Sequence, residues 1–373
     1  MSRRERKPEA LVLDEGVLRE GPVCEIGGAL AVEACGGLVV TPWRDRYRAA
    51  EIAELEVAAS TEGVGDESYP QVVVHLQKSR AATAIDLAEA WRILAPGGQL
   101  LFAGTNGVGV TSAVKRLAKQ LDQSPIVVTN RARARVVRFK KDGGPGPARE
   151  TTPSIEACVE ALDGTPHSLA LETRPGVFSA KKLDTGSELL LGALAGFVGH
   201  KPPKRVVDLG CGTGVLGLAA ATLYPDVECL LADADARAVA CARANVEALG
   251  LGERVRVEWW DAREKPLGDR YDLALVNPPF HQHGTEVDLG PALALFRSLG
   301  TWLGRNGRAL VVANRTLPYE QALAEEGQVE TVASTRGYKL LSLKRSARSS
   351  GSRGRRSPGS RSAGRSRDAT RSR

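Results

Sequence analysis

The sequence lacks the long apolar run that a membrane span requires, because no stretch approaches about 20 consecutive apolar residues. The first residues, MSRRERKP, are largely charged and lead into no hydrophobic signal region. The six cysteines are scattered and none lies in a CxxC pair, which argues against a zinc site or a disulfide framework and fits reduced thiols in a cytosol. These absences predict a soluble, cytoplasmic protein.

Basic residues are concentrated at the C-terminus. Residues 344–373 contain eleven Lys and Arg against one acid, for a net charge of +10, and since the whole chain carries +7, residues 1–343 carry −3. This segment consists of Ser, Arg and Gly with almost nothing apolar, so we expect a disordered tail, and we expect disorder at residues 1–9 as well. A flexible polycation attracts polyanions, which predicts nonspecific contact with RNA. The alternative is a solubilising tail without a specific role.

Length and apolar content favour two domains. A chain of 373 residues suits two domains of about 150 residues each, and 42% hydrophobic residues can fill two ordinary cores. Two stretches, 72–102 and 273–312, each contain a buried strand, a helix, a glycine turn and a second strand. Between them, residues 140–147 (KKDGGPGP) are typical of a linker. We therefore predict an α/β protein with two tandem doubly wound Rossmann-like domains, over 10–150 and 151–343.

The second domain contains a glycine-rich turn that is typical of a nucleotide-like ligand site. The apolar strand expected over 205–209 is followed by Gly-x-Gly-x-Gly and then by a helix. Glycines at such a turn let the backbone approach a ligand and direct the N–H groups of a helix N-terminus toward it. The spacing differs from the Gly-x-Gly-x-x-Gly of dinucleotide sites. The cofactor-binding residues predicted here are Asp208, Gly210, Gly212 and Gly214.

Carboxylates follow the next two predicted strands. Asp233 ends a strand about twenty residues after the glycine turn, where a carboxylate can accept both hydroxyls of a ribose. Its alternative role is to cap the following helix, although Asp235 is also placed to be that cap. Asp261 and Ala262 follow the next strand and are predicted to meet an adenine edge; ordinary loop polarity is the alternative.

The most specific signal is a buried strand that ends in Asn277, Pro278, Pro279 and Phe280. Two prolines stiffen the turn and leave the Pro278 carbonyl without a competing donor. The Asn277 oxygen and that carbonyl can accept the two hydrogens of an exocyclic amine, orienting a weak nucleophile without a strong base. Phe280 offers a flat surface on which an extruded base can stack. We predict that these four residues are catalytic and that Asn277 also lies against the cofactor; the alternative is a structural turn.

Two histidines, His281 and His283, come directly after this motif. Their spacing resembles that of metal ligands, but no third ligand cluster is apparent in the sequence. We predict that the protein binds no metal and that these histidines lie in a loop on the substrate side.

The N-terminal copy differs where the chemistry is expected. After its corresponding strand it has His75-Leu76-Gln77-Lys78 in place of Asn-Pro-Pro-Phe. Its glycine cluster over 104–109 follows the wrong strand to form the tight turn. We therefore predict a degenerate domain that has lost cofactor binding.

Together these motifs resemble the bacterial ribosomal RNA guanine-N2 methyltransferases, a family of class I enzymes that includes a small-subunit (16S rRNA) enzyme and its large-subunit sibling. The resemblance extends to RPGVFS at 174–179 and LDTGSELLL at 183–191. It implies S-adenosylmethionine as cofactor, a guanine 2-amino group as acceptor, and ribosomal RNA or a ribosomal subunit as partner. It further implies that the degenerate first domain helps to bind RNA.

Three other functions remain open at this level. Asn-Pro-Pro-aromatic motifs also occur in methyltransferases that act on adenine N6 and on protein glutamine side chains. The tandem degenerate domain and the RPGVFS segment count against the glutamine enzyme. A non-catalytic RNA-binding assembly factor could keep the fold, but it would need neither the glycine loop nor Asn277.

Overall fold

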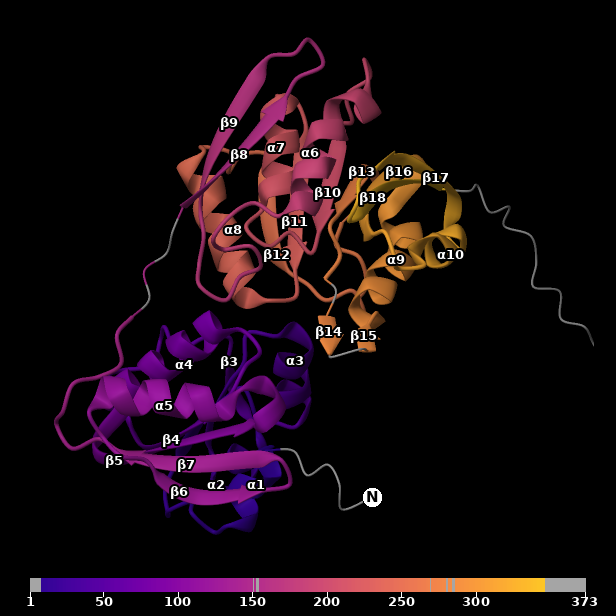
Figure 1. Ribbon diagram of the computed structural model, residues 1–373. Coiled ribbons are helices and arrows are strands. Elements are labelled where there is room, and N and C mark those ends of the chain that lie inside the picture. The colour runs from indigo at the N-terminus through magenta and orange to yellow at the C-terminus, as the bar shows by residue number, and fades with distance from the viewer. Residues whose placement is uncertain are drawn as a thin grey trace, which may run out of the picture.

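The computed structural model describes residues 8–345 except 150, 152, 153, 269, 280, 284 and 285. In this part of the chain, two α/β domains are each built on a seven-stranded sheet. Figure 1 shows them as two lobes, with the N-terminal domain in indigo to magenta and the C-terminal domain in magenta to yellow. The prediction of two tandem doubly wound domains is confirmed.

The N-terminal sheet has the strand order β3-β2-β1-β4-β5-β7-β6. Its strands are β1 (Val23–Ile26), β2 (Gly37–Val40), β3 (Glu56–Ala58), β4 (Tyr69–His75), β5 (Leu94–Thr105), β6 (Ile126–Arg131) and β7 (Ala134–Lys140). Its helices are α1 (Pro8–Asp14), α2 (Leu30–Cys35), α3 (Arg44–Ile52), α4 (Arg80–Ile93) and α5 (Val110–Leu121), with a 3₁₀ turn at Asn106–Val108. The first three helices pack on one face of the sheet, and α4 and α5 pack on the other.

The C-terminal sheet has the order β12-β11-β10-β13-β16-β18-β17. Its strands are β10 (Arg205–Leu209), β11 (Glu228–Asp233), β12 (Val255–Trp259), β13 (Tyr271–Val276), β16 (Leu303–Asn314), β17 (Gly327–Ser334) and β18 (Tyr338–Arg345). Its helices are α6 (Thr185–Val198), α7 (Val215–Leu223), α8 (Ala236–Ala248), α9 (Gly290–Trp302) and α10 (Tyr319–Ala324). Helices α6, α7 and α8 cover one face, and α9 and α10 cover the other.

Both sheets place their strands in the same spatial sequence, as expected for two copies of one domain. In each, the first five strands pair in parallel and the last two pair antiparallel. The chain reverses its direction of travel across the C-terminal sheet between β10 and β13. In open α/β sheets, ligands bind at the carboxyl ends of the strands beside such a switch point.

Two small antiparallel pairs complete the C-terminal domain. In β8 (Ser154–Glu160) and β9 (Pro166–Glu172), buried and exposed residues alternate, and the buried side packs on α6, α7 and α8. The second pair, β14 (His281–His283) and β15 (Glu286–Asp288), projects from the C-terminal domain on the side that faces the N-terminal domain (Figure 1).

The ends of the predicted disordered segments are ordered, which corrects two predicted limits. Helix α1 begins at Pro8, because proline suits the first helical turn and Leu11 and Val12 bury their side chains in the core. Strand β18 extends to Arg345, since Lys344 still pairs with Arg308 of β16. The rest of the two segments, 1–7 and 346–373, lies outside the described residues. No helix in the described part of the chain is both long and apolar enough to cross a membrane.

Candidate functional site

The glycine loop joins β10 to α7 through three residues with left-handed backbone. Gly210, Gly212 and Gly214 have φ values of 75°, 57° and 88°, which a side chain would disfavour. At Gly214 a Cβ atom would also lie 3.0 Å from Leu231 Cδ1. The loop is fixed to the neighbouring strand, since the N–H of Gly210 donates to the carbonyl of Ala232 at 2.8 Å. The predicted glycines therefore form a tight, hydrogen-bonded loop in which Gly210 and Gly212 are half-buried and Gly214 is buried.

Asp208 lies beneath this loop. Its side chain is completely buried, and its Oδ2 accepts a hydrogen bond from the N–H of Gly217 in α7 at 2.9 Å. Its Oδ1 is buried without a hydrogen-bond partner among the described residues, and burial raises the pKa of the carboxyl to about 7. Asp208 thus fastens α7 to β10 behind the loop. Its direct contact with a cofactor stays a prediction.

Asp233 ends β11 and faces the glycine loop. Its Oδ2 accepts the N–H of Gly212 at 2.9 Å and its Oδ1 accepts the N–H of Asp235 at 2.9 Å. Asp235 is the N-cap of α8, because its carboxylate accepts the N–H of Arg237. Asp233 is therefore not needed as the cap. Each of its oxygens already accepts one backbone N–H and has a further lone pair to offer a hydroxyl.

Asp261 follows β12 and is paired with a neighbouring arginine. Its two oxygens accept Nε and Nη2 of Arg263 at 2.6 and 2.7 Å. Burial opposes ionisation, but these hydrogen bonds outweigh it and lower the pKa of Asp261. Ala262, next in the chain, is half-buried against the core. The two predicted adenine-side residues thus lie in a loop whose conformation is held by an ion pair.

Asn277 lies at the edge of the sheet next to the first residue of the glycine loop. Val276, the last residue of β13, pairs with Leu209 of β10, so Asn277 and Gly210 leave the sheet side by side. The Asn277 amide Nδ2 donates to Ser187 Oγ at 2.9 Å and also contacts the carboxylate of Asp184. The structure therefore brings Asn277 together with the glycine loop and with the start of α6.

The rest of the proline motif is described only in part. Pro278 is buried and Pro279 is exposed at the turn. Phe280 lies outside the described residues, as do the side chains of His281 and His283, so their predicted roles stay predictions. Among the described residues, no group of three His, Cys, Asp or Glu side chains is arranged to hold a metal ion.

Known proteins with similar sequences show the family to which this chain belongs. Residues 168–342 match the family described as Methyltransferase small domain. The chain is 32% identical to ribosomal RNA small subunit methyltransferase C of Klebsiella pneumoniae over 270 residues, which cover 72% of this chain and 74% of that protein. It is 31% identical to the protein of the same name from Escherichia fergusonii over 289 residues, covering 77% and 78%. The chain belongs to the ribosomal RNA small subunit methyltransferase C family.

A solved structure extends this likeness to both domains. The T. thermophilus 16S rRNA N2 methyltransferase (RsmC), in complex with AdoMet and guanosine, matches this methyltransferase with a TM-score of 0.78 and 26% identity. The match covers 92% of this chain and 93% of that chain. The tandem arrangement is therefore shared with a member of the family.

In this methyltransferase the N-terminal domain holds the loop that follows β12. Glu264 accepts Arg44 Nε at 2.9 Å and Arg48 Nη1 at 3.0 Å, both from α3. Arg263, the partner of Asp261, also contacts Asp45 of α3 at 3.1 Å. The predicted adenine-side loop is thus bound through its charges to the other domain.

The same part of the N-terminal domain holds the loop that follows β11. The N–H of Arg44 donates to Ala234 O at 2.9 Å, and the N–H of Ala236 donates to Pro42 O at 2.8 Å. Ala234 and Ala236 come just after Asp233 in the chain. Sequence reasoning missed these contacts because they join segments almost two hundred residues apart, and neither segment carries a local motif.

In the N-terminal domain, two buried side chains occupy the position that corresponds to the site. By strand register, Glu25 of β1 corresponds to Asp208, and His75 at the end of β4 corresponds to Asn277. His75 Nε2 lies 2.7 Å from Glu25 Oε1, and both side chains are buried. A Cβ atom at Gly28 would lie 2.5 Å from Glu25 Oε1, which shows how closely this region is packed. The packing gives a physical reason for the predicted loss of cofactor binding.

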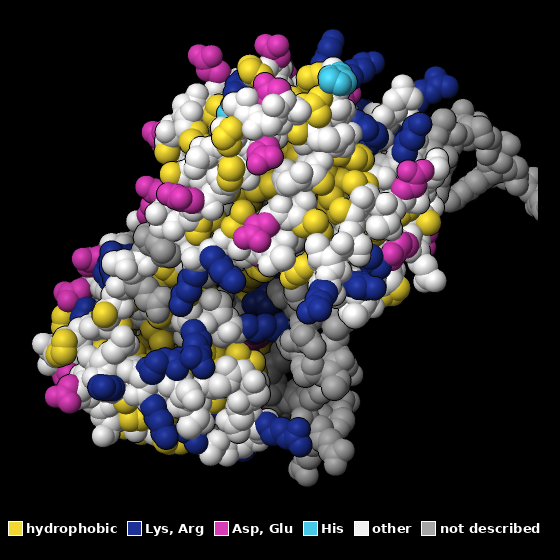
Figure 2. Space-filling model, turned by 45° about the horizontal axis from the view of Figure 1, so that its top comes forward, with side chains coloured by type: hydrophobic (Ala, Val, Ile, Leu, Met, Phe, Trp, Pro, Cys, Tyr) yellow, Lys and Arg dark blue, Asp and Glu magenta, His cyan; other side chains and the backbone are white. Residues whose placement is uncertain are grey.

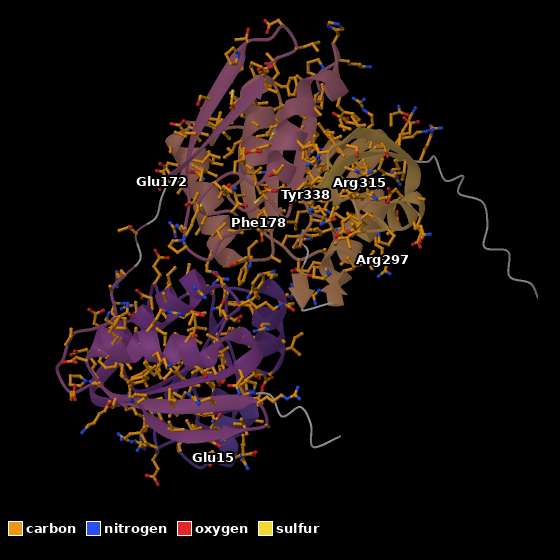
Figure 3. The ribbon with its side chains drawn as sticks, in the orientation of Figure 1. Glu15, Glu172, Phe178, Arg297, Arg315 and Tyr338 are labelled. Atoms are coloured by element: carbon orange, nitrogen blue, oxygen red, sulfur yellow. The ribbon has the colours of Figure 1, made fainter. Side chains whose placement is uncertain are left out.

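An exposed aromatic lies beside the domain junction. Phe178, in the loop between β9 and α6, is 62% exposed, whereas the adjacent Val177 is buried against α8. Gly176 of this loop packs against Ala82 of the N-terminal domain. Figure 3 shows Phe178 on the side of the C-terminal domain that faces the N-terminal domain. The RPGVFS segment carried the family resemblance, but its sequence did not indicate which residue would be exposed.

Proposed function

We propose that this enzyme transfers a methyl group from S-adenosylmethionine to the exocyclic N2 amine of a guanine in 16S ribosomal RNA. The observation that carries the proposal is the placement of Asn277 beside the glycine loop at the switch point of the C-terminal sheet. The names of the relatives and the guanosine and AdoMet in the T. thermophilus complex support the same substrate and donor. A ribosomal substrate would place the enzyme in the cytoplasm.

The residues present fit the donor. The sulfonium of S-adenosylmethionine supplies an electrophilic methyl group when it is bound. Gly210 and Gly212 have left-handed backbone, are half-buried and carry no side chain to block a ligand, and Asp233 has lone pairs available for two ribose hydroxyls. Asp261 and Ala262 would line the adenine side. We assign donor binding to these residues together with Asp208 and Asn277.

The acceptor amine is a weak nucleophile because its lone pair is delocalised into the base. Asn277 Oδ1 and the Pro278 carbonyl would accept its two hydrogens and direct the lone pair toward the methyl group. Pro279 stiffens the turn, and Phe280, together with the exposed Phe178, offers flat surfaces for an extruded base. In this step the nitrogen would bond to the methyl carbon as the carbon–sulfur bond breaks, S-adenosylhomocysteine would leave, and the methylated amine, acidic while it is cationic, would release one proton to water. No strong general base is required.

The proposal is tested by methyl transfer from radiolabelled S-adenosylmethionine to ribosomal particles from a strain that lacks the gene. Separated 30S and 50S subunits are the substrates, and the labelled nucleoside is then identified. We expect N2-methylguanosine in 30S subunits. Label in 50S subunits would point to the large-subunit sibling activity, and label in adenine or protein would favour the alternative methyltransferases. If no substrate is labelled, the chain is better described as an RNA-binding assembly factor.

We further propose that a basic surface of the N-terminal domain contacts the RNA backbone. Residues 110–141 contain nine Lys and Arg against one acid, whereas residues 8–70 contain four against thirteen. On α5, Lys115, Arg116 and Lys119 are exposed. Figure 2 shows dark blue side chains gathered over the N-terminal domain and its junction with the other domain. The tail at 346–373, outside the described residues, would add nonspecific attraction through its charge.

Combined replacement of Lys115, Arg116 and Lys119 by alanine should weaken RNA binding and reduce its salt dependence. Each lost phosphate contact lowers the slope of log affinity against log salt by about 0.7–0.9. The matched control replaces Lys201, Lys204 and Arg305, which are exposed near the amino ends of β10 and β16, away from the site. Filter binding to a 16S rRNA fragment across a salt series measures both. Equal slopes for the two triple variants would contradict the proposal.

A further inference from the structure

The carboxylate of Asp184 contacts two different parts of the site. As the N-cap of α6, its Oδ1 accepts the N–H groups of Gly186 and Ser187 at 2.9 and 3.3 Å. The same carboxylate accepts Nδ2 of Asn277, which lies 3.1 Å from Oδ2 and 3.3 Å from Oδ1. One side chain therefore joins the first turn of α6 to the residue that follows β13.

This contact determines which way the Asn277 amide points. An ionised carboxylate can only accept hydrogen bonds, so it selects the NH₂ end of the amide and repels the oxygen end. The Ser187 hydroxyl, 2.9 Å from Nδ2, can donate or accept and so makes no such selection. With Nδ2 directed at Asp184, the amide oxygen is left for another partner.

The first turn of α6 is held close to the sheet, which keeps Asp184 in place. A Cβ atom at Gly186 would lie 2.7 Å from Val312 Cγ1 of β16 and 3.5 Å from Asn277 Oδ1. Glycine at this position lets the helix approach the strand and leaves space next to the Asn277 oxygen. Asp184 is thus fixed both by its own capping bonds and by close packing beneath it.

We propose that Asp184 is a positioning residue for methyl transfer, because it holds Asn277 with its oxygen available to the acceptor amine. This inference rests on the proposed function, in which that oxygen accepts an amine hydrogen. In the reverse orientation, the NH₂ group of Asn277 would face the NH₂ group of the base, and two donors would oppose each other. Asp184 itself contacts neither donor nor acceptor in this account.

Asp184→Asn separates the positioning role from the capping role. Asparagine is as good an N-cap as aspartate, so the helix should keep its stability. Its oxygen would serve the N–H groups of α6, leaving its NH₂ group toward Asn277, which favours the reversed amide. We expect kcat to fall on the order of 10²-fold, as for loss of one preorganised hydrogen-bonding group. The dissociation constant for S-adenosylmethionine, measured by calorimetry, should change little.

Three further variants, Asp184→Ser, Asp184→Ala and a double change, make the test decisive. Asp184→Ser also retains a cap but does not reverse the amide, so its kcat should lie between those of the wild type and Asp184→Asn. The double change Asp184→Asn with Asn277→Asp restores an acceptor oxygen toward the amine and should recover part of kcat. A purely structural role predicts instead that kcat follows the melting temperature, with Asp184→Ala lowest and Asp184→Asn near normal. That result would overturn the inference, whereas an inactive wild-type enzyme would overturn the proposed function.

Discussion

Replacing Asn277 by alanine is expected to lower the rate of methyl transfer by about 10²–10³-fold, the usual cost of removing one preorganised hydrogen-bonding group at a reacting centre. The change removes the acceptor oxygen that orients the amine. It removes only the contact that Asn277 itself makes with the donor and leaves the glycine loop and Asp233 in place, so most of the affinity for S-adenosylmethionine should be retained. Single-turnover transfer to 30S subunits measures the rate, and calorimetry measures donor affinity.

Two controls for this variant are its melting temperature and the rate of a second variant at the same position. Asp184 still accepts the N–H groups of Gly186 and Ser187 and so still caps α6, and the melting temperature should therefore fall only slightly. Asn277→Ser, which keeps a small polar group but cannot reach the same position, should be nearly as slow as alanine. Transfer at a near-normal rate in either variant would show that the amine is oriented by other residues.

Replacing Asp233 by alanine should weaken donor binding rather than slow the chemistry at saturation. Hydrogen bonds to a charged group contribute about 1.5–3 kcal/mol each, so loss of the two ribose contacts should raise the dissociation constant by at least about 10²-fold. The variant also frees the N–H groups of Gly212 and Asp235, which loosens the loop. The matched control is Asp226→Ala, an exposed acid that precedes the same strand. Equal affinities in the two variants would refute the ribose assignment.

Donor binding should also depend on pH through Asp233. Burial raises the pKa of this carboxyl to about 6. Above that pH the group is ionised and accepts hydrogen bonds with both oxygens; below it, the added proton removes one acceptor, so affinity should fall as the pH drops. Asp233→Asn should lose the part of this dependence that is centred near pH 6. Asp208, whose pKa burial raises to about 7, remains in that variant, so any pH dependence that persists is assigned to Asp208.

Local features of the site could be predicted from the sequence because they depend on neighbouring residues. The glycine loop requires left-handed backbone at fixed spacing, and Asp233 ends a strand recognisable by its apolar run. The duplicated strand order was indicated by the similarity of two stretches. In contrast, the contact between Asp184 and Asn277 spans 93 residues of sequence and depends on how α6 packs on β16. No local pattern encodes such a distance.

The two ends of the ordered chain show the same difference between local sequence and contacts with distant segments. Composition placed residues 8–9 and 344–345 in disordered segments, since charged residues prevail there. The structure orders them because Leu11 and Val12 anchor α1, and because Lys344 completes a strand pairing. Tertiary contacts decided the outcome at both ends, against the local composition.

The hydrogen bonds and ion pairs that α3 and the residues just before it make with the loops after β11 and β12 have a thermodynamic consequence. If docking of the N-terminal domain and binding of S-adenosylmethionine both order these loops, the two events share a coupling free energy, and that coupling is reciprocal. The donor then stabilises the docked arrangement by the same factor by which docking strengthens donor binding. Binding of the donor to the C-terminal domain would thereby make the junction between the two domains more rigid than it is in the empty enzyme.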